Sequence, residues 1–323
     1  MTEKRPAQAE PRKARVRRPE ESLLTSILLD HAVEIAAECR ADAILVYADV
    51  LPDGRWEKAD RIPQKVLFVT KTEAEQEQQE SLGHRVIRVP NVAFTRLGQL
   101  KMAIFLALNR GLLDPKDRVV CLSGIDESGT LDTLVVMEVG REFEMLVTPG
   151  DQKSIAPNIR PEVLDRVIDI ASDLGAEGRE GKPVGALFVV GDTERVLPLT
   201  RQLVLNPFHG YPEEMRNILD PRLEETIKEF STIDGAFIVR GDGTIVTAGA
   251  YLKTAGLSGE SLPQGLGARH HAAAAITGVT DSVAVTVSQS TGTVTIFRNG
   301  QIVTEIEKPR RLGGAPRPEA TES

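Results

Sequence analysis

The chain has 323 residues, 41% of them hydrophobic and 27% charged, values typical of a globular protein with about two domains. Its 47 acidic and 39 basic residues give a net charge of −8, which argues against a protein that coats nucleic acid. No segment approaches the ~18 apolar residues of a membrane span, and the basic, Pro-rich start lacks the apolar core of a secretory signal. We therefore expect a cytoplasmic protein.

The two cysteines lie far apart in the sequence, each inside an apolar segment. Cys39 and Cys121 belong to no C-x-x-C pair, so we predict two buried free thiols in a reducing compartment and neither a disulfide nor a metal site.

The first part of the chain alternates helical and strand patterns. Residues 1–21 are basic and Pro-rich, and we expect them to form a disordered tail. Helical spacing or charge patterning predicts helices over 23–37, 73–80 and 97–108, and short apolar runs predict strands over 43–47, 66–69, 85–89, 119–124 and 134–137. Strands that alternate with helices indicate a parallel sheet with helices on both faces, here over residues 22–150.

A polar, Pro-containing segment at 151–160 is typical of a linker, and a second α/β unit is expected over 161–307. Its predicted helices span 161–174, 221–230 and 268–277, and its predicted strands span 185–190, 237–239, 244–247, 281–287, 293–297 and 301–306. The turn at 240–243 joins two of these strands as a hairpin, and its Arg-Gly-Asp triplet is better explained by that turn than by adhesion. Residues 308–323 are expected to be a disordered tail.

Asp234 follows a predicted helix and begins a predicted strand. An aspartate at such a point is commonly a turn residue, but it can also bind a metal ion or orient a hydroxyl group. Gly235 and Ala236 next to it would let a flat ligand approach the backbone closely.

A basic group opens the helix predicted after Gly267. Arg269, His270 and His271 lie in its first turn, where free backbone amides and the helix dipole favour a bound anion such as phosphate. A two-histidine metal site lacks a third ligand, and ordinary surface residues remain an alternative.

Four motif fragments in a fixed order resemble the diadenylate cyclase family. That family carries Asp-Gly-Ala, then Gly-Thr-Arg-His-Arg about thirty residues on, then Ser-Glu-x-Thr-Asp, and then Ser-Glu-Glu-Thr-Gly after a strand. Here residues 234–236, 267–271, 277–281 and 288–292 read DGA, GARHH, TGVTD and SQSTG. The resemblance spans roughly 160–305. Residues 22–150 resemble the C-terminal domain of pyruvate kinase, and this combination is similar to archaeal diadenylate cyclases.

The resemblance implies a mixed-sheet α/β domain that converts two ATP molecules into cyclic di-AMP and two pyrophosphates across a face-to-face homodimer, with Mg²⁺ or Mn²⁺. Asp234 would place the metal and the 3′-hydroxyl, and Arg269 and His270 would hold phosphates. The other residues that the family pattern implies in nucleotide binding are Gly235, Ala236, Leu252 on adenine, Gly267, Ala268, His271 and Ser288.

The chain departs from the family pattern at several of these positions. Ala268 replaces a threonine, His271 replaces an arginine, and Gln289 and Ser290 replace two glutamates. Loss of a carboxylate leaves fewer ligands for a metal ion, although Mg²⁺ often uses few protein ligands. We therefore keep two hypotheses: an active cyclase, or a catalytically degenerate module that binds ATP or cyclic di-AMP.

Overall fold

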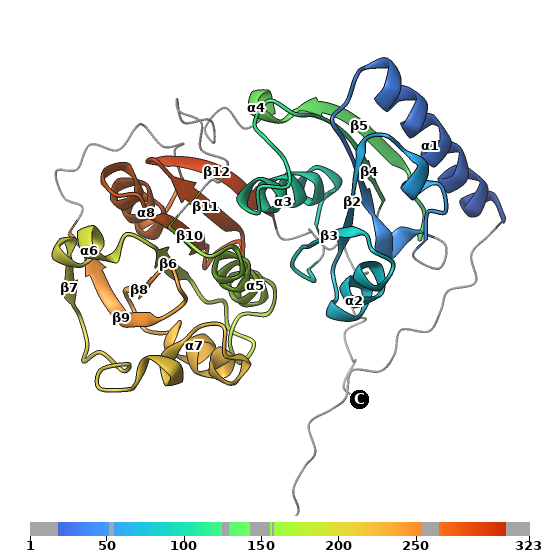
Figure 1. Cartoon of the computed structure of the whole chain (residues 1–323). Helices are drawn as coiled ribbons and strands as arrows, with labels where there is room; N and C mark the ends of the chain where they lie inside the picture. The colour runs from blue at the N-terminus through green and yellow to red at the C-terminus, as the bar shows by residue number, and fades with distance from the viewer. Residues whose placement is uncertain are drawn as a thin grey trace, which may run out of the picture.

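The computed structural model describes residues 19–51, 55–92, 94–124, 129–142, 156, 158–253 and 265–307, and the two halves of the chain each build a sheet flanked by helices (Figure 1). The α/β fold class predicted from the sequence is confirmed. The predicted tail at 308–323 and most of the glycine-rich segment at 254–267 lie outside the described residues.

The first sheet has the strand order β3-β2-β1-β4-β5. Its elements are α1 (Pro19–Glu38), β1 (Ala43–Tyr47), β2 (Lys65–Thr70), α2 (Glu73–Ser81), β3 (Arg85–Arg88), α3 (Arg96–Asn109), β4 (Arg118–Ser123), β5 (Thr133–Glu138) and α4 (Val139–Glu142). All five residues of β1 are buried, as expected of a central strand with a continuous apolar run. Helices α1 and α3 cover opposite faces of the sheet (Figure 1).

Three expectations for this half were wrong in whole or in part. β5 runs antiparallel to β4, because only Gly124 to Asp132 connect the two strands, too few residues for the crossover that a parallel pair needs. Helix α1 begins at Pro19, so the last three residues of the predicted tail are helical; a proline suits the first turn of a helix. Both cysteines are free thiols, but Cys39 is partly exposed, whereas burial raises the pKa of Cys121 to about 12.

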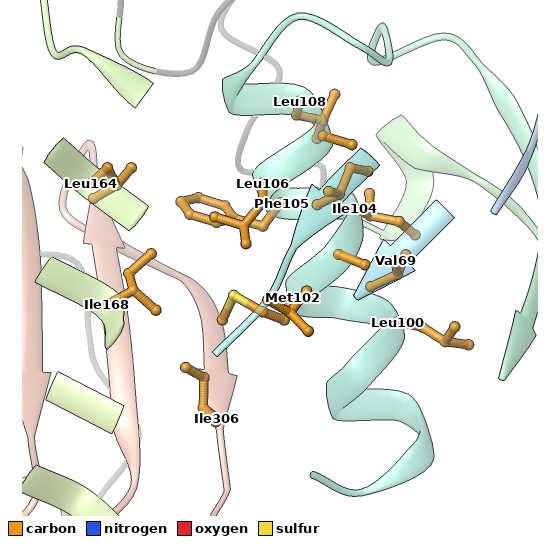
Figure 2. Packing of buried hydrophobic residues seen from close by; sticks show 14 of the residues in the cluster. Val69, Leu100, Met102, Ile104, Phe105, Leu106, Leu108, Leu164, Ile168 and Ile306 are labelled. Carbon is orange, nitrogen blue, oxygen red and sulfur yellow. The ribbon is translucent and has the colours of Figure 1, made fainter. Parts of the chain in front are cut away.

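Helix α3 lies between the two halves of the molecule. It is apolar on nearly all sides, the pattern of a helix that is buried all round. On one side, Val69 of the first sheet lies beside it (Figure 2). On the other, Met102 and Phe105 lie toward Leu164 and Ile168, and one cluster of buried hydrophobic residues continues across both halves (Figure 2).

The second sheet has the strand order β12-β11-β10-β6-β8-β9-β7, in which β6 and β8 pair in parallel and the other neighbouring strands pair antiparallel. Its main elements are α5 (Pro161–Glu177), β6 (Ala186–Val190), α6 (Thr193–Val196), β7 (Thr200–Gln202), α7 (Glu224–Phe230), β8 (Ala236–Val239), β9 (Ile245–Leu252), α8 (Ala268–Val279), β10 (Val283–Val287), β11 (Val294–Arg298) and β12 (Gln301–Ile306). No pattern in the sequence predicts α6 and β7, because both are too short to show a period.

Alternation along the central strands sends side chains to two different helices. In β6, Phe188 and Val190 join the buried cluster on the α5 side, and Leu187 and Val189 join a second cluster on the α8 side. The sheet is therefore covered on both faces, by α5 and by α8 (Figure 1).

The linker predicted at 151–160 lies mostly outside the described residues; Ile159 within it is buried.

Two ion pairs join α5 to the first half. Arg110 contacts Asp165, and Arg88 Nη2 lies 3.2 Å from Asp169 Oδ2. Burial raises the pKa of Asp169 to about 6, against the opposing effect of the Arg88 charge. The folded protein therefore holds the Asp169 proton more tightly than the unfolded chain does. This group stabilises the fold fully below the unfolded pKa of 3.8, and that contribution is lost as the pH rises through about 6.

The variant Asp169→Asn mimics the protonated carboxyl group. We expect it to raise the free energy of unfolding at pH 7.5 by about 1–3 kcal/mol and to change it little at pH 4, as measured by urea unfolding at both pH values. Asp173→Asn is the matched control, because Asp173 also lies on α5 but pairs with Lys228 of α7, within the second half. A loss of stability at pH 7.5 in Asp169→Asn would mean that the Arg88 pair outweighs the burial of the charge.

Candidate active site

A cleft of about 1770 Å³ opens at one end of the second sheet. It is bounded by the start of β8, the end of β9, the first turn of α8, the turn between β10 and β11, the end of β12 and the segment just before α3. Ligand pockets usually measure about 300–1,000 Å³, so this cleft has room for a ligand as large as a nucleoside triphosphate.

The structure brings every site residue predicted from the sequence to this cleft. Those residues are Asp234, Gly235, Ala236, Leu252, Gly267, Ala268, Arg269, His270, His271 and Ser288. They come from four separate segments, and the sheet and α8 bring those segments together. Their position at one cleft is an observation, whereas their individual roles stay predictions.

Asp234 and Arg269 form a charged pair in the cleft. Arg269 Nη2 donates to Asp234 Oδ1 at 3.1 Å. The Asp234 side chain is 89% exposed, so its second oxygen can reach a ligand. The Arg269 guanidinium lies over Gly185, where an added Cβ atom would come within 2.7 Å of Nη1. A larger residue at 185 would therefore displace the guanidinium.

Gly235 is required by the fold itself. Its φ angle is +112°, and an added Cβ atom would lie 2.5 Å from the carbonyl carbon of Gly249 in β9. The register between β8 and β9 shifts just after this position, between Ala236 and Ile238 and again before Val239, as at a β-bulge. The close approach that makes Gly235 necessary is to a neighbouring strand, whereas the sequence suggested an approach to the ligand.

His270 lies in the first turn of α8 and is only 6% exposed. Its Nε2 atom is 3.5 Å from Thr295 Oγ1, its ring meets Phe297 edge to face, and its buried Nδ1 atom has no hydrogen-bond partner among the described residues. Burial, and then the charges of His271 and Arg269, lower the pKa of His270 below its ordinary value of 6.5. At pH 7 His270 is therefore neutral, and it offers a hydrogen bond but no positive charge.

The turn between β10 and β11 forms another wall of the cleft. Ser288 Oγ lies 3.3 Å from Ser290 Oγ, and the backbone N–H of Thr291 donates to Ser288 Oγ at 3.4 Å. Ser290 is exposed, and Gln289 lines the cleft beside it. Leu252 is 4% exposed and packs in the cluster on the α8 side.

Sequence reasoning missed several residues of the cleft. Phe94, Thr95 and Arg96 come from the first half of the chain, and Glu305 and Glu307 lie on or just after β12. No local pattern marks them, because only the packing of α3 beside β12 brings them to the cleft.

A divalent metal ion would find the carboxylate of Asp234 at this site. The described part of the chain contains no group of three or more His, Cys, Asp or Glu side chains that could hold a metal ion. Asp234 has an exposed oxygen that Arg269 does not contact. This arrangement fits Mg²⁺, which commonly takes one or two carboxylates and completes its coordination with phosphates and water.

The fold and the cleft are those of a nucleotide-binding α/β protein, and comparison with known families agrees. Residues 173–302 match the family described as "DisA bacterial checkpoint controller nucleotide-binding", and residues 24–147 match "Probable sensor domain DacZ_P". The chain is 32% identical over 308 residues to a diadenylate cyclase of Methanocaldococcus jannaschii, covering 88% of this chain and 97% of the relative. The chain belongs to the diadenylate cyclase family, as its motifs predicted.

A second relative is the diadenylate cyclase of Haloferax volcanii, 35% identical over 212 residues, which cover 65% of this chain and 75% of that protein. Among solved structures, DacA from Staphylococcus aureus is similar with a TM-score of 0.28 and 23% identity, over 44% of this chain and 84% of that one. A TM-score this low supports no conclusion. Within the described residues, no helix has the length and apolarity needed to cross a bilayer.

Proposed function

We propose that this protein is a diadenylate cyclase that condenses two ATP molecules into cyclic di-AMP and two pyrophosphates. The observation that carries the proposal is the convergence of all ten predicted site residues on one cleft, where Asp234 and Arg269 are in contact. Membership of the diadenylate cyclase family supports the same reaction.

In this proposal the 3′-hydroxyl oxygen of each nucleotide attacks the α-phosphorus of the other. A new P–O bond forms, the bond between the α-phosphorus and the bridging oxygen breaks, and pyrophosphate leaves while the hydroxyl proton passes to solvent. Such chemistry depends on positioning and charge stabilisation more than on covalent catalysis. Two active sites must face each other, so the working unit is a homodimer.

The described residues suggest a role for each group. Arg269, fixed over Gly185, supplies positive charge to the phosphates, and neutral His270 supplies a hydrogen bond through its unpartnered nitrogen. The exposed oxygen of Asp234 orients the 3′-hydroxyl and contacts the metal ion. A bound Mg²⁺ or Mn²⁺ ion would neutralise phosphate charge. Leu252 and Ser288 contact adenine and phosphate.

We also propose a division of labour along the chain. Residues 161–307 form the nucleotide-binding unit of a cytoplasmic protein. Residues 22–150 sense a ligand and regulate that unit. The name of the family matched by residues 24–147 supports this division, as does the packing of α3 against the second half.

A second candidate function is a module that binds ATP or cyclic di-AMP without turnover. Ser290 and Gln289, in place of two family glutamates, favour it, because both side chains lack a carboxylate at the wall of the cleft. Incubation of the protein with ATP and Mg²⁺ or Mn²⁺, followed by chromatography, separates the two. Cyclic di-AMP among the products supports the cyclase. ATP binding without product under either metal would leave the binding module, and failure to bind ATP would exclude both.

Ser290→Glu should restore a carboxylate at the wall of the cleft. We expect this variant to bind the metal ion more tightly, so that half-maximal activity is reached at a severalfold lower Mn²⁺ or Mg²⁺ concentration. Thr291→Glu is a matched control, because it adds the same charge one residue further along the turn. Equal metal dependence in the wild type and Ser290→Glu would contradict the placement of the metal near residue 290.

A further inference from the structure

The first half of the chain contributes a charged residue to the cleft. Arg96 is the first residue of α3 and lines the cleft together with Phe94 and Thr95. Its side chain is 45% exposed. Family motifs in the second half of the chain give no reason to look for a cleft residue so far upstream.

The orientation of the Arg96 guanidinium is fixed by Asp132. Arg96 Nε donates to Asp132 Oδ1 at 3.0 Å, and Arg96 Nη2 donates to Oδ2 at 2.6 Å. A guanidinium has five N–H donors, so this pair leaves both hydrogens of Nη1 and one of Nη2 for another acceptor.

Asp132 is itself held firmly. Its N–H donates to the Ser123 carbonyl oxygen at 3.1 Å, and Thr133 Oγ1 donates to Asp132 Oδ1 at 2.7 Å. The hydrogen bonds from Arg96 lower the pKa of Asp132, so its carboxylate stays charged at pH 7.

The position of Arg96 is unfavourable for helix stability. Cations are disfavoured at a helix N-terminus, and the first turn of α3 contains no acidic residue to offset this charge. Asp132, from another segment, supplies the offset. Local choices that oppose stability are typical of functional positions.

Few positively charged side chains in the described part of the chain line the cleft, and Arg96 is one of them. Among the described residues that line it, Arg96 and Arg269 are the lysine or arginine side chains, whereas Asp234, Glu305 and Glu307 are acidic. His270 is neutral at pH 7 because its pKa is lowered. Arg269 already contacts Asp234. A polyphosphate in this cleft therefore has few permanent cations to bind, and Arg96 is one of them.

We propose that Arg96 is a phosphate-binding residue of the nucleotide site, supplied by the first half of the chain, and that Asp132 is its positioning residue. The inference rests on the proposed function, because it assumes that a nucleotide occupies the cleft. In this proposal the Arg96–Asp132 ion pair links the first half of the chain to the bound nucleotide, because Asp132 directly precedes β5.

Calorimetric titration of the full chain with ATP and with adenosine tests this inference. We expect Arg96→Ala to weaken ATP binding about tenfold or more, because the variant loses a hydrogen bond to the charged phosphates. Adenosine has no phosphates, so its binding should be unchanged. Arg96→Lys keeps the charge and should recover part of the ATP affinity. Equal ATP affinity in Arg96→Ala and the wild type would overturn the proposal.

The role of Asp132 is tested by a double-mutant cycle. We expect Asp132→Ala to change ATP affinity in the wild type and to have no effect in the Arg96→Ala background, because Asp132 acts through Arg96. The same change in both backgrounds would overturn the positioning role.

Arg240→Ala is the matched control. Arg240 also makes two hydrogen bonds to one carboxylate, Glu213, but it does not line the cleft. Removal of the Arg240 side chain should leave ATP affinity unchanged. If Arg240→Ala weakened ATP binding as much as Arg96→Ala does, the weakening would not be specific to the cleft, and the proposal would be overturned. Failure of the wild type to bind ATP would instead count against the proposed function, so the two failures are distinguishable.

Discussion

Asp234→Asn is expected to reduce the rate of cyclic di-AMP formation by about 100- to 1,000-fold, the usual cost of removing one charge-stabilising group from an active site. The substitution preserves shape but removes the charge that would orient the 3′-hydroxyl and contact the metal ion. The side chain is 89% exposed and contacts Arg269, so the fold should be unaffected. Initial rates measured by chromatography, with circular dichroism to check folding, provide the test.

Asp281→Asn is the matched control for this variant. Asp281 is also an exposed carboxylate paired with an arginine, Arg195, but it does not line the cleft. We expect it to retain wild-type activity. If Asp234→Asn and Asp281→Asn had equal rates, Asp234 would have no part in the reaction, and the proposed role of the cleft would be wrong.

Gly235→Ala is expected to lower the free energy of unfolding by about 3–5 kcal/mol, through backbone strain at positive φ and overpacking of the strand interface. At φ +112° the new methyl group would lie 2.5 Å from the carbonyl carbon of Gly249 and 2.7 Å from the nitrogen of Ala250. Backbone atoms of a paired strand cannot move aside without breaking the sheet. Urea unfolding followed by circular dichroism measures the change.

Gly210→Ala separates strain from overpacking. Gly210 has φ +83°, but an added Cβ atom there would meet nothing within 4 Å. We expect a loss of about 1–2 kcal/mol, the cost of the backbone conformation alone. If both variants lost the same stability, the contact with β9 would not be what requires glycine at 235.

The sequence predicted most of the helices and strands, because their patterns are local. The continuous apolar runs of β1 and β6 and the repeat of small residues in α8 lie within single segments. The antiparallel direction of β5 was missed, since direction depends on the length of the connection and on pairing with β4. The short elements α6 and β7 were missed because three or four residues carry no period.

For the site, the sequence alone predicts the family and the motif residues of the cleft, because the motifs around Asp234 and Arg269 are contiguous and occur in a fixed order. The burial, charge and contacts of those residues follow from the three-dimensional packing. Burial of the first turn of α8 against β11 makes His270 neutral, and the approach of β9 explains Gly235. The packing of α3 between the two halves brings Arg96 to the cleft. Proximity, burial and charge arise from contacts between distant segments, and no local pattern records them.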